Sequence, residues 1–382
     1  MIMNPEDYKI CTKLVLDTSY SDVFFDENGI SNTFNNFQNN IKKNWHTDHQ
    51  GDKHLKETVA LIKKVGEGKE FDSIMGLSGG LDSSYMLHKM VTEYGLRPLV
   101  FHVDGGWNSE LAVHNINVLV DKLGLDLYTE VINWQEMKNF QLAMFKSGVP
   151  HIDIPQDHSF IAVLYKFAQE HDIKYILNGG NIASESVAVP LDTFYWGTDL
   201  IQIRDILNKF GTIEMESYPF SSIFYHKLYL RYFRGIKVFK PLNYMPFVQK
   251  DAISTLQETY NWKPYPQKHF ESRFTRFFEG YWLPSRFGID VRRAQFSSLI
   301  LSDQMTREEA LERLNNPPYD PELMQQDFEY VATKLGIDES ELRSLHEMPK
   351  KHFSDYRNMH RVFQLGEWVL SKIAGTTRGG AF

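Results

Sequence analysis

A glycine-rich stretch, Ser78-Gly79-Gly80-Leu81-Asp82-Ser83-Ser84, lies where an apolar run ends and a helical pattern begins. The apolar run at 73–77 predicts a short buried strand, and the apolar spacing over 82–94 predicts a helix. Two adjacent glycines allow a tight turn and a close approach of the backbone to a ligand. The free amides at the start of a helix attract anions. The stretch therefore predicts a strand–turn–helix unit whose turn binds an anion such as the pyrophosphate part of a nucleotide.

Two common phosphate-binding motifs are absent from this turn, because it lacks the lysine of the Walker A motif and the GxGxxG pattern of dinucleotide sites. A simpler interpretation is a Gly/Ser-rich turn in which Asp82 or Ser83 caps the helix. The position directly after a predicted strand favours nucleotide binding instead. The stretch resembles the PP-loop of the ATP pyrophosphatases, which cleave ATP between the α- and β-phosphates and adenylylate an oxygen of their substrate. This resemblance implies that ATP is the ligand.

Strand and helix patterns alternate from about residue 56 to 180. Strands are predicted at 73–77, 98–103, 125–132 and 174–177, and helices at 82–94, 109–123, 135–146 and 159–171. Such alternation predicts an α/β fold with a parallel sheet covered on both faces. Beyond about Pro190 the pattern is mainly helical. We therefore expect a small ribbon-like N-terminal segment at 1–55, a PP-loop domain at 56–245 and a mainly helical substrate or partner region at 246–382.

Two further loops with paired glycines, at 103–108 and 178–185, follow predicted strands. Ligands of parallel sheets bind beyond the carboxyl ends of the strands, so the three loops are expected to form one site. Asp104 is a candidate contact to a ribose or a metal. The predicted nucleotide-binding residues are Ser78, Gly79, Gly80, Leu81, Asp82, Ser83, Ser84, Val103, Asp104, Gly179 and Gly180.

Composition excludes several classes of function. The formal net charge of −8 argues against a large nucleic-acid surface, and no apolar run is long enough for membrane insertion. The N-terminal residues lack the pattern of a signal peptide, which predicts a cytoplasmic protein. A single cysteine, Cys11, excludes an intramolecular disulfide, a cysteine-ligated iron–sulfur cluster and a two-cysteine sulfur relay. No cysteine follows Met1, so no glutaminase with an N-terminal cysteine nucleophile is expected.

Three segments together resemble one family. They are the glycine-rich stretch, the loop at 178–185, and Lys268-His269-Phe270-Glu271-Ser272-Arg273-Phe274-Thr275-Arg276-Phe277 with its continuation at 284–293. The set is similar to the N-acetyl sugar amidotransferases of the WbpG/PseA type, which make acetamidino sugars for bacterial surface polysaccharides or flagellin glycans. The resemblance implies ATP- and Mg²⁺-dependent conversion of a sugar N-acetyl group to an acetamidino group, through an adenylylated amide.

The resemblance also implies roles for individual residues. Catalytic roles fall to Asp82, Lys268 and Arg292, with Asp82 as a Mg²⁺ ligand. The candidates for binding an acidic N-acetylated sugar or sugar nucleotide, or the leaving phosphates, are Asn181, Glu185, His269, Glu271, Arg273, Arg276 and Arg293. A plainer interpretation makes Glu271, Arg273 and Arg276 a solvated helix face with salt bridges. His151, Asp153, Asp157 and His158 form either a metal site or, as we favour, loop polar groups with Asp157 capping the next helix.

The ammonia must then come from partners. The resemblance implies a separate glutaminase and an ammonia-channelling barrel subunit, akin to the pair of histidine biosynthesis. The segment 224–235 carries an apolar stripe (Phe224, Leu228, Tyr232) beside a basic one (Lys227, Arg231, Arg234). This pattern is typical of an ordinary amphipathic helix, which we favour, or of a docking helix.

The N-terminal segment departs from the family. Relatives carry two CxxC-like pairs there as a zinc ribbon. Here Cys11 is the first cysteine, but Leu14 stands where the second would fall, and Ser31 and Phe34 stand at the positions of the later pair. One thiolate cannot build a tetrahedral zinc site, so we expect a ribbon shape without zinc.

Three other functions stay open at this stage. A tRNA-modifying PP-loop enzyme would need a basic surface and often catalytic cysteines. An asparagine-synthetase-like ligase would carry its own glutaminase domain. A non-catalytic nucleotide-binding subunit would release no pyrophosphate with any sugar. The identity of the acceptor sugar does not follow from the sequence.

Overall fold

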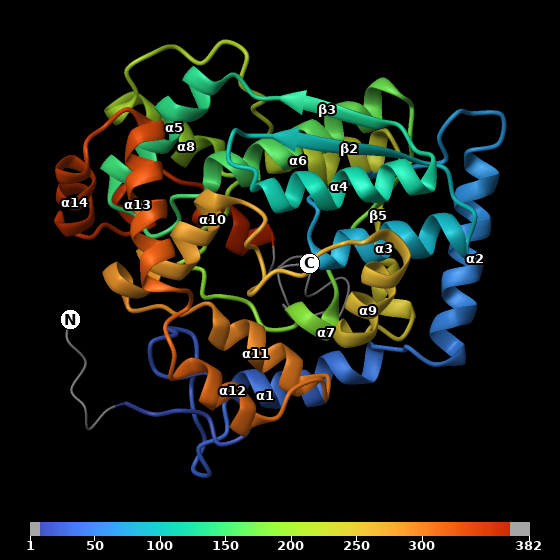
Figure 1. The fold of residues 1–382 in the computed structure, drawn as a ribbon, viewed down its shortest axis with the longest axis horizontal. Helices are drawn as coiled ribbons and strands as arrows, with labels where there is room; N and C mark the ends of the chain where they lie inside the picture. Colours follow the sequence, from blue (N-terminus) through green and yellow to red (C-terminus); the bar gives the residue numbers. More distant parts are fainter. Residues whose placement is uncertain (1–7, 367–382) are drawn as a thin grey trace.

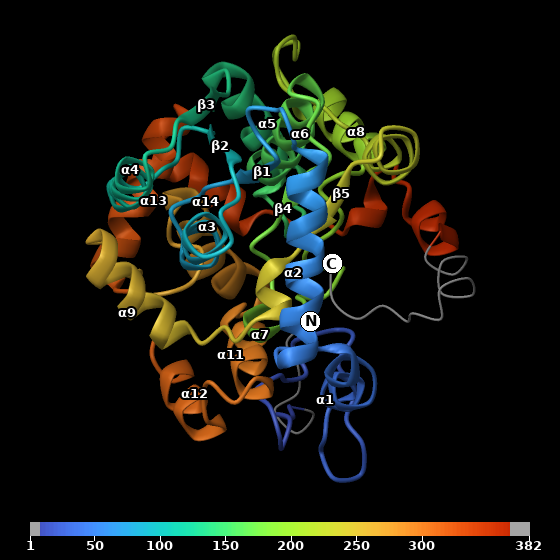
Figure 2. The same cartoon turned by 90° about the vertical axis from the view of Figure 1, so that its right-hand side faces the viewer.

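The computed structural model describes residues 8–366, apart from the side chains of residues 227 and 228. Within these residues, parallel strands form a five-stranded sheet in the order β3-β2-β1-β4-β5, which confirms the predicted α/β class (Figures 1 and 2). The strands are β1 (Ser73–Gly76), β2 (Pro98–Asp104), β3 (Leu127–Val131), β4 (Tyr175–Leu177) and β5 (Lys237–Phe239). The central position of β1 places the glycine-rich stretch, here called the glycine loop (residues 78–84), in the middle of one sheet edge.

Beyond Pro190 the chain is mainly helical, as predicted, apart from the short edge strand β5, which was not predicted. It pairs with β4, with Lys237 opposite Tyr175 and Phe239 opposite Leu177. Only Phe239 of its three residues is buried, and Val238 is 49% exposed. So short a strand shows no alternating pattern, and for that reason no pattern in the sequence indicated it.

Helices cover both faces of the sheet, because neighbouring strand residues point to opposite sides. Ile74 packs with residues of α5 and α6, whereas Met75 packs with residues of α2, α3 and α4. These helices are α2 (His49–Val65), α3 (Leu81–Thr92), α4 (Glu110–Leu123), α5 (Trp134–Ser147) and α6 (Ile154–Glu170). The predicted boundary at 55/56 falls inside α2.

The start of α6 corrects a second expectation. The helix is capped at Asp153, with Pro155 in its first turn, so Asp157 lies inside the helix and is not its cap. His151 contacts Asp157 (Nε2 to Oδ2, 3.2 Å), and His158 Nδ1 lies 2.7 Å from the Gly197 carbonyl oxygen. Across residues 8–366, no group of three or more His, Cys, Asp or Glu residues is arranged to hold a metal ion.

The later helices pack on the same sheet. Leu256 of α9 shares a core with Met75, and Phe328 of α13 shares a core with Ile74. The packing is therefore continuous across the predicted boundary at 245/246. The later elements are α7 (Ile182–Glu185), α8 (Leu200–Phe210), η4 (Tyr225–Phe233), η5 (Pro241–Tyr244), α9 (Gln249–Tyr260), α10 (Arg273–Phe277), η6 (Phe278–Phe287), α11 (Arg292–Leu301), α12 (Arg307–Leu314), α13 (Pro321–Leu335), α14 (Glu339–Glu347) and η7 (Phe353–Asp355).

The element η4 corresponds to the predicted amphipathic segment, but it is a π-helix. Its inward side chains are His226 and Leu230, whereas Phe224 and Tyr232, from the predicted apolar stripe, are exposed. The 3.6-residue spacing fails here because the hydrogen bonds of a π-helix reach one residue further than those of an α-helix. The side chains of the stripe residues Lys227 and Leu228 lie outside the described residues.

The N-terminal segment contains two turns, each closed by a single antiparallel bridge, Ile10 with Asp17 and Phe25 with Ser31. The Cys11 sulfur accepts the backbone N–H groups of Leu14 and Ser31, both at 3.3 Å. Leu14 is fully buried, so apolar packing occupies a position where the resemblance implied a cysteine. Hydrogen bonds to sulfur and hydrophobic contacts thus join the two turns.

The same segment packs against α11 and α12, at the bottom of the molecule in both views (Figures 1 and 2). It continues into α1 (Asn32–Asn36), η2 (Phe37–Ile41) and η3 (Lys42–Asn44). Within residues 8–366, no helix combines the length and the apolar character that crossing a membrane requires.

Candidate active site

The glycine loop joins β1 to α3, and a side chain at either of its glycines would meet a close neighbour. Gly79 has a φ of +80°, and a Cβ atom there would lie 2.7 Å from the Ala112 carbonyl oxygen. A Cβ on Gly80 would lie 1.8 Å from Oε1 of Glu271. Gly80 is the N-cap of α3, so neither Asp82 nor Ser83 caps the helix as the simpler interpretation required.

Hydroxyl groups shape the inside of the loop. The Gly80 N–H donates to Ser78 Oγ at 3.2 Å, and Ser83 Oγ lies 3.2 Å from the same oxygen. Ser84 is fully buried, so this predicted phosphate contact faces the interior. With two hydroxyls and the first amides of α3 at one place, the loop has the donors that an anion requires.

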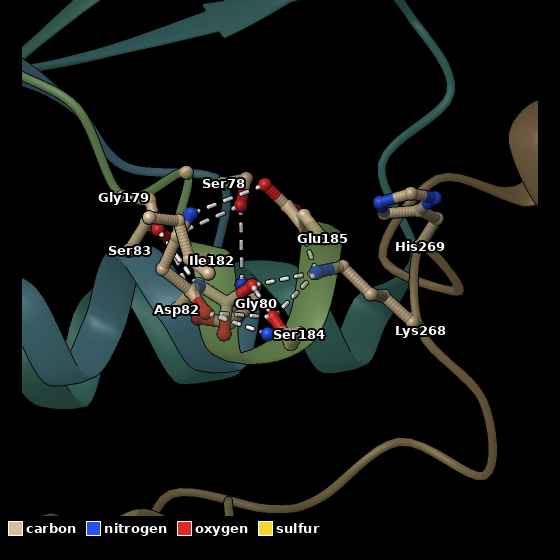
Figure 3. Close-up of polar contacts among 12 residues, drawn as sticks. Ser78, Gly80, Asp82, Ser83, Gly179, Ile182, Ser184, Glu185, Lys268 and His269 are labelled. Atoms are coloured by element: carbon tan, nitrogen blue, oxygen red, sulfur yellow. Dashed lines mark hydrogen bonds and ion pairs between the residues drawn. The ribbon is translucent and has the colours of Figure 1, made fainter. Parts of the chain in front are cut away.

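Three charged side chains meet beside the loop. Lys268 Nζ lies 2.8 Å from Asp82 Oδ2 and 2.6 Å from Glu185 Oε1, and it donates to Ser184 Oγ at 3.2 Å. Figure 3 shows the Lys268 side chain reaching between these groups, which come from α3, from α7 and from the segment before α10. The predicted residues Asp82, Glu185 and Lys268 are thus brought together, although they are far apart in the sequence.

Burial and ion pairing act against each other on the pKa values of the three charged residues in this cluster. Burial alone would lower the pKa of Lys268, but the carboxylates of Asp82 and Glu185 outweigh it and raise that pKa. Burial favours the neutral form of Glu185, yet Lys268 lowers its pKa overall. For Asp82, burial dominates over Lys268 and raises the pKa. Lys268 therefore offsets only part of the effect that burial has on the Asp82 carboxylate.

The loop after β4 forms the second wall of the site. Asn181 caps α7 by accepting the Ser184 N–H at 2.9 Å, and this cap presents Ser184 and Glu185 to Lys268. A Cβ on Gly179 would lie 3.2 Å from the Ser83 nitrogen, so this loop packs directly on the glycine loop. The Gly180 N–H donates to Asn178 Oδ1 at 2.7 Å.

The loop after β2 forms the third wall. Asp104 Oδ1 accepts the Gly106 N–H at 2.7 Å and the Asn108 amide at 3.2 Å, so the carboxylate shapes its own loop. The side chain of Val103 is in the core, which leaves only its backbone for a ligand. Asn108 forms a bridge with Ser272, next to Glu271, whose carboxylate packs on Gly80.

His269 lies beside the cluster and contacts a different carboxylate. Its Nδ1 is 3.0 Å from Glu279 Oε1 on η6, and Figure 3 shows its ring away from Asp82. Burial would lower the pKa of His269, but the charge and hydrogen bond of Glu279 outweigh burial and raise that pKa to about 9. His269 is therefore an imidazolium at neutral pH.

This ion pair predicts a pH-dependent stability. The folded-state pKa exceeds the value of about 6.5 in the unfolded chain, so the stabilisation is complete below pH 6.5 and is lost as the pH rises through 9. We compare the wild type with His269→Asn, because asparagine tolerates the left-handed φ of +67° at this position. The difference in Tm between the two proteins should be largest near pH 6 and should vanish near pH 10. A difference that stays constant over this range would contradict the role of the imidazolium.

Four predicted arginines are not part of this cluster. Arg273 and Arg276 both bind the fully buried Asp327 of α13, so they do not form the solvated helix face of the plainer interpretation. Arg292 pairs with Asp290 at 2.7 Å, although it also lines a shallow hollow that includes Lys268. Arg293 pairs with Asp17 at 2.8 Å and thereby fastens the N-terminal segment. These cations stabilise the fold.

Sequence reasoning missed three residues that fix the backbone of the glycine loop. Asn115 of α4 and the two aromatic residues Trp262 and Tyr265 all donate to the Gly79 carbonyl oxygen. They belong to no motif, and their patterns indicate only a helix interior and an aromatic loop. No signal in the sequence could have connected them with a glycine 183 positions away from Trp262.

Comparison with solved structures gives distant likenesses. NMN synthetase from Francisella tularensis has 14% identity and a TM-score of 0.37, covering 73% of this chain and 94% of its own. The NH3-dependent NAD synthetase from Campylobacter jejuni has 13% identity and a TM-score of 0.31, covering 78% and 98%. The U34-tRNA thiolase NcsA from Methanococcus maripaludis has 14% identity and a TM-score of 0.33, covering 80% and 82%.

A comparison with curated proteins finds no match. The family comparison is specific: residues 271–370 match the family described as LPS biosynthesis protein WbpG-like, C-terminal domain. The match begins at Glu271, the residue whose carboxylate packs on Gly80 of the glycine loop. It confirms, over residues 271–370, the resemblance to the WbpG type that the segment around residues 268–293 indicated. At residues 271–370, this chain therefore carries a WbpG-like C-terminal domain.

Proposed function

We propose that this protein is an ATP-dependent amidotransferase that converts the N-acetyl group of an acidic sugar or sugar nucleotide to an acetamidino group. The observation that carries the proposal is the junction of the glycine loop with the start of the WbpG-like domain. Glu271 of that domain packs on Gly80, and Lys268, three residues earlier, binds Asp82 and Glu185. The match itself supports the broader class of ATP-dependent amidotransferases and synthetases.

The chemistry explains why ATP is needed. An amide carbonyl is a poor electrophile, and its oxygen is a poor leaving group. Attack of that oxygen on the α-phosphate of ATP forms an adenylylated amide and releases pyrophosphate. Ammonia then displaces AMP and leaves the amidine. The partners in this proposal are a separate glutaminase and a barrel subunit that channels its ammonia.

The residues of the glycine loop have defined tasks in this scheme. The Gly80 N–H and the Ser78 and Ser83 hydroxyls bind the leaving pyrophosphate, and Lys268 stabilises its charge. Because these donors are fixed before the substrate arrives, catalysis comes from positioning and electrostatics, and a nucleophilic triad is not needed.

A Mg²⁺ ion fits the residues at this site. Asp82 Oδ1 is buried and has no hydrogen-bond partner among the described residues. Mg²⁺ binds carboxylate oxygens together with the phosphates of a nucleotide, so Asp82 would hold it, with Glu185 as the adjacent carboxylate. When bound, Mg²⁺ neutralises charge on the phosphates during the transfer.

The direct test supplies ATP, Mg²⁺, an ammonium salt and a panel of N-acetylated sugars and sugar nucleotides. We expect AMP and pyrophosphate to form with one class of acidic sugar, and mass spectrometry should show an NH group in place of one oxygen. Parallel reactions without sugar, and with tRNA in its place, measure the background. AMP formation with tRNA, but with no sugar, would replace the proposal with a tRNA-modifying function.

A further inference from the structure

The Gly79 carbonyl oxygen accepts an unusual number of hydrogen bonds. Trp262 Nε1 donates to it at 3.1 Å, the Tyr265 hydroxyl at 3.2 Å and Asn115 Nδ2 at 3.3 Å. Asn115 is fully buried and Trp262 is 2% exposed, so water does not compete for the bonds from these two side chains. We call these three side chains the Gly79 clamp. A carbonyl oxygen has two lone pairs, so three donors saturate it.

Holding this carbonyl also orients the next amide. In a trans peptide the C=O and the following N–H point in opposite directions. Because the Gly79 oxygen faces the clamp, the Gly80 N–H faces the inside of the loop, where it donates to Ser78 Oγ. This N–H is one of the donors that the proposed function assigns to pyrophosphate.

The Gly79–Gly80 peptide lies between two glycines, and glycine is the residue that most readily allows a peptide group to rotate. Glycine populates positive and negative φ about equally, so rotation of the Gly79–Gly80 peptide meets little steric resistance from its own residues. A flipped peptide would direct a carbonyl oxygen at a bound phosphate. The loop therefore needs an external lock, and the clamp is placed where such a lock must act.

The clamp is itself firmly attached to α4. Asn115 Nδ2 donates to the Lys263 carbonyl oxygen and Asn115 Oδ1 accepts the Lys263 N–H, both at 2.8 Å. On the C-terminal side of Lys268, the Ser109 N–H donates to the Glu271 carbonyl oxygen at 2.9 Å. The segment at 266–270 is thus fastened at both ends to α4 and the loop before it, which gives Lys268 and the Gly79 peptide one common support.

We propose that Asn115, Trp262 and Tyr265 are positioning residues that lock the Gly79–Gly80 peptide with its N–H toward the phosphates of the nucleotide. This inference rests on the proposed nucleotide binding at the glycine loop. None of the three side chains needs to touch the ligand. Their effect on it passes through the orientation of one peptide group.

The test compares Tyr265→Phe, Trp262→Phe and the double variant with the wild type. Calorimetry measures the Kd for ATP and for inorganic pyrophosphate, and kinetics of AMP formation separate kcat from KM. Loss of one hydrogen bond should weaken pyrophosphate binding about 3- to 10-fold, and the double variant should lose more. The matched control is Tyr260→Phe, which removes the hydroxyl that lies 2.7 Å from His88 Nδ1 and does not contact the loop. It should leave pyrophosphate binding unchanged.

Two results would overturn the inference. One is unchanged pyrophosphate affinity in the double variant. The other is a loss of affinity in Tyr260→Phe equal to that in Tyr265→Phe, because the effect would then follow from stability alone. A wild type that binds ATP and pyrophosphate normally, but forms no AMP with any sugar, would end the proposed function. If its clamp variants still bound pyrophosphate more weakly, the inference would stand.

Discussion

Replacing Asp82 with Asn should reduce AMP and pyrophosphate formation by about 10²- to 10³-fold or more, the scale expected for a group that stabilises transition-state charge. The substitution keeps the size of the side chain but removes its negative charge. Lys268 then loses one of its two carboxylate partners, and the unpartnered Oδ1 is no longer a carboxylate oxygen for Mg²⁺. Both losses fall at the start of α3, where the phosphates are proposed to bind. The reaction is measured by AMP release with a sugar that the wild type accepts.

The control for this experiment is Asp251→Asn. This substitution makes the same chemical change at an exposed side chain in the first turn of α9. It should leave AMP formation unchanged. Circular dichroism and thermal melting of both variants show whether folding is intact. If Asp82→Asn forms AMP at the wild-type rate, Asp82 has no part in the chemistry.

Replacing Asp327 with Ala should lower the free energy of unfolding by about 3–5 kcal/mol, the range for breaking a buried ion pair by removing one partner. The fully buried carboxylate accepts four hydrogen bonds, from Nε and Nη2 of both Arg273 and Arg276, at 2.6–3.0 Å. Without it, two guanidinium groups lie between α10 and α13 with no counter-charge. Urea unfolding measures the change.

An exposed ion pair provides the comparison for Asp327→Ala. Glu339 and Arg343 are one turn apart on α14, with 3.4 Å between charged atoms and about half of each side chain exposed. Glu339→Gln should cost less than about 0.5 kcal/mol, because water screens such pairs. If Asp327→Ala costs no more than this variant, the arginine–aspartate cluster does not hold the two helices together.

Local patterns in the sequence were enough to predict the sheet, four of its strands and the position of the glycine loop. They succeeded because β1 and α3 carry continuous apolar patterns and the glycines mark the turn between them. The pairing of Asp82, Glu185 and Lys268 was not visible in any pattern, since the residues lie on separate segments. The resemblance to a family placed all three in the site, but only the fold shows that they touch.

The arginines show that helical spacing does not reveal partners on other elements. Arg273 and Arg276 have the spacing of one helix face, and this spacing describes neighbours on the same helix only. Their partner, Asp327, follows them by about fifty positions and is hidden in the core. The sequence alone does not distinguish an arginine that is available to bind phosphate from one that is paired with a buried carboxylate. The same limit applies to Asn115, Trp262 and Tyr265.

The distance along the chain between the glycine loop and its clamp has a consequence for synthesis. Gly79 and Trp262 are 183 positions apart, and Lys268 follows Asp82 by 186. At the ribosome, where chains grow by about 5–20 residues per second, the loop is made roughly ten seconds or more before the segment that fixes it. During that interval the Gly79–Gly80 peptide is free to turn over. The proposed role of the clamp thus implies that a nascent chain with a complete glycine-rich motif retains a nucleotide only after its last third has emerged and folded.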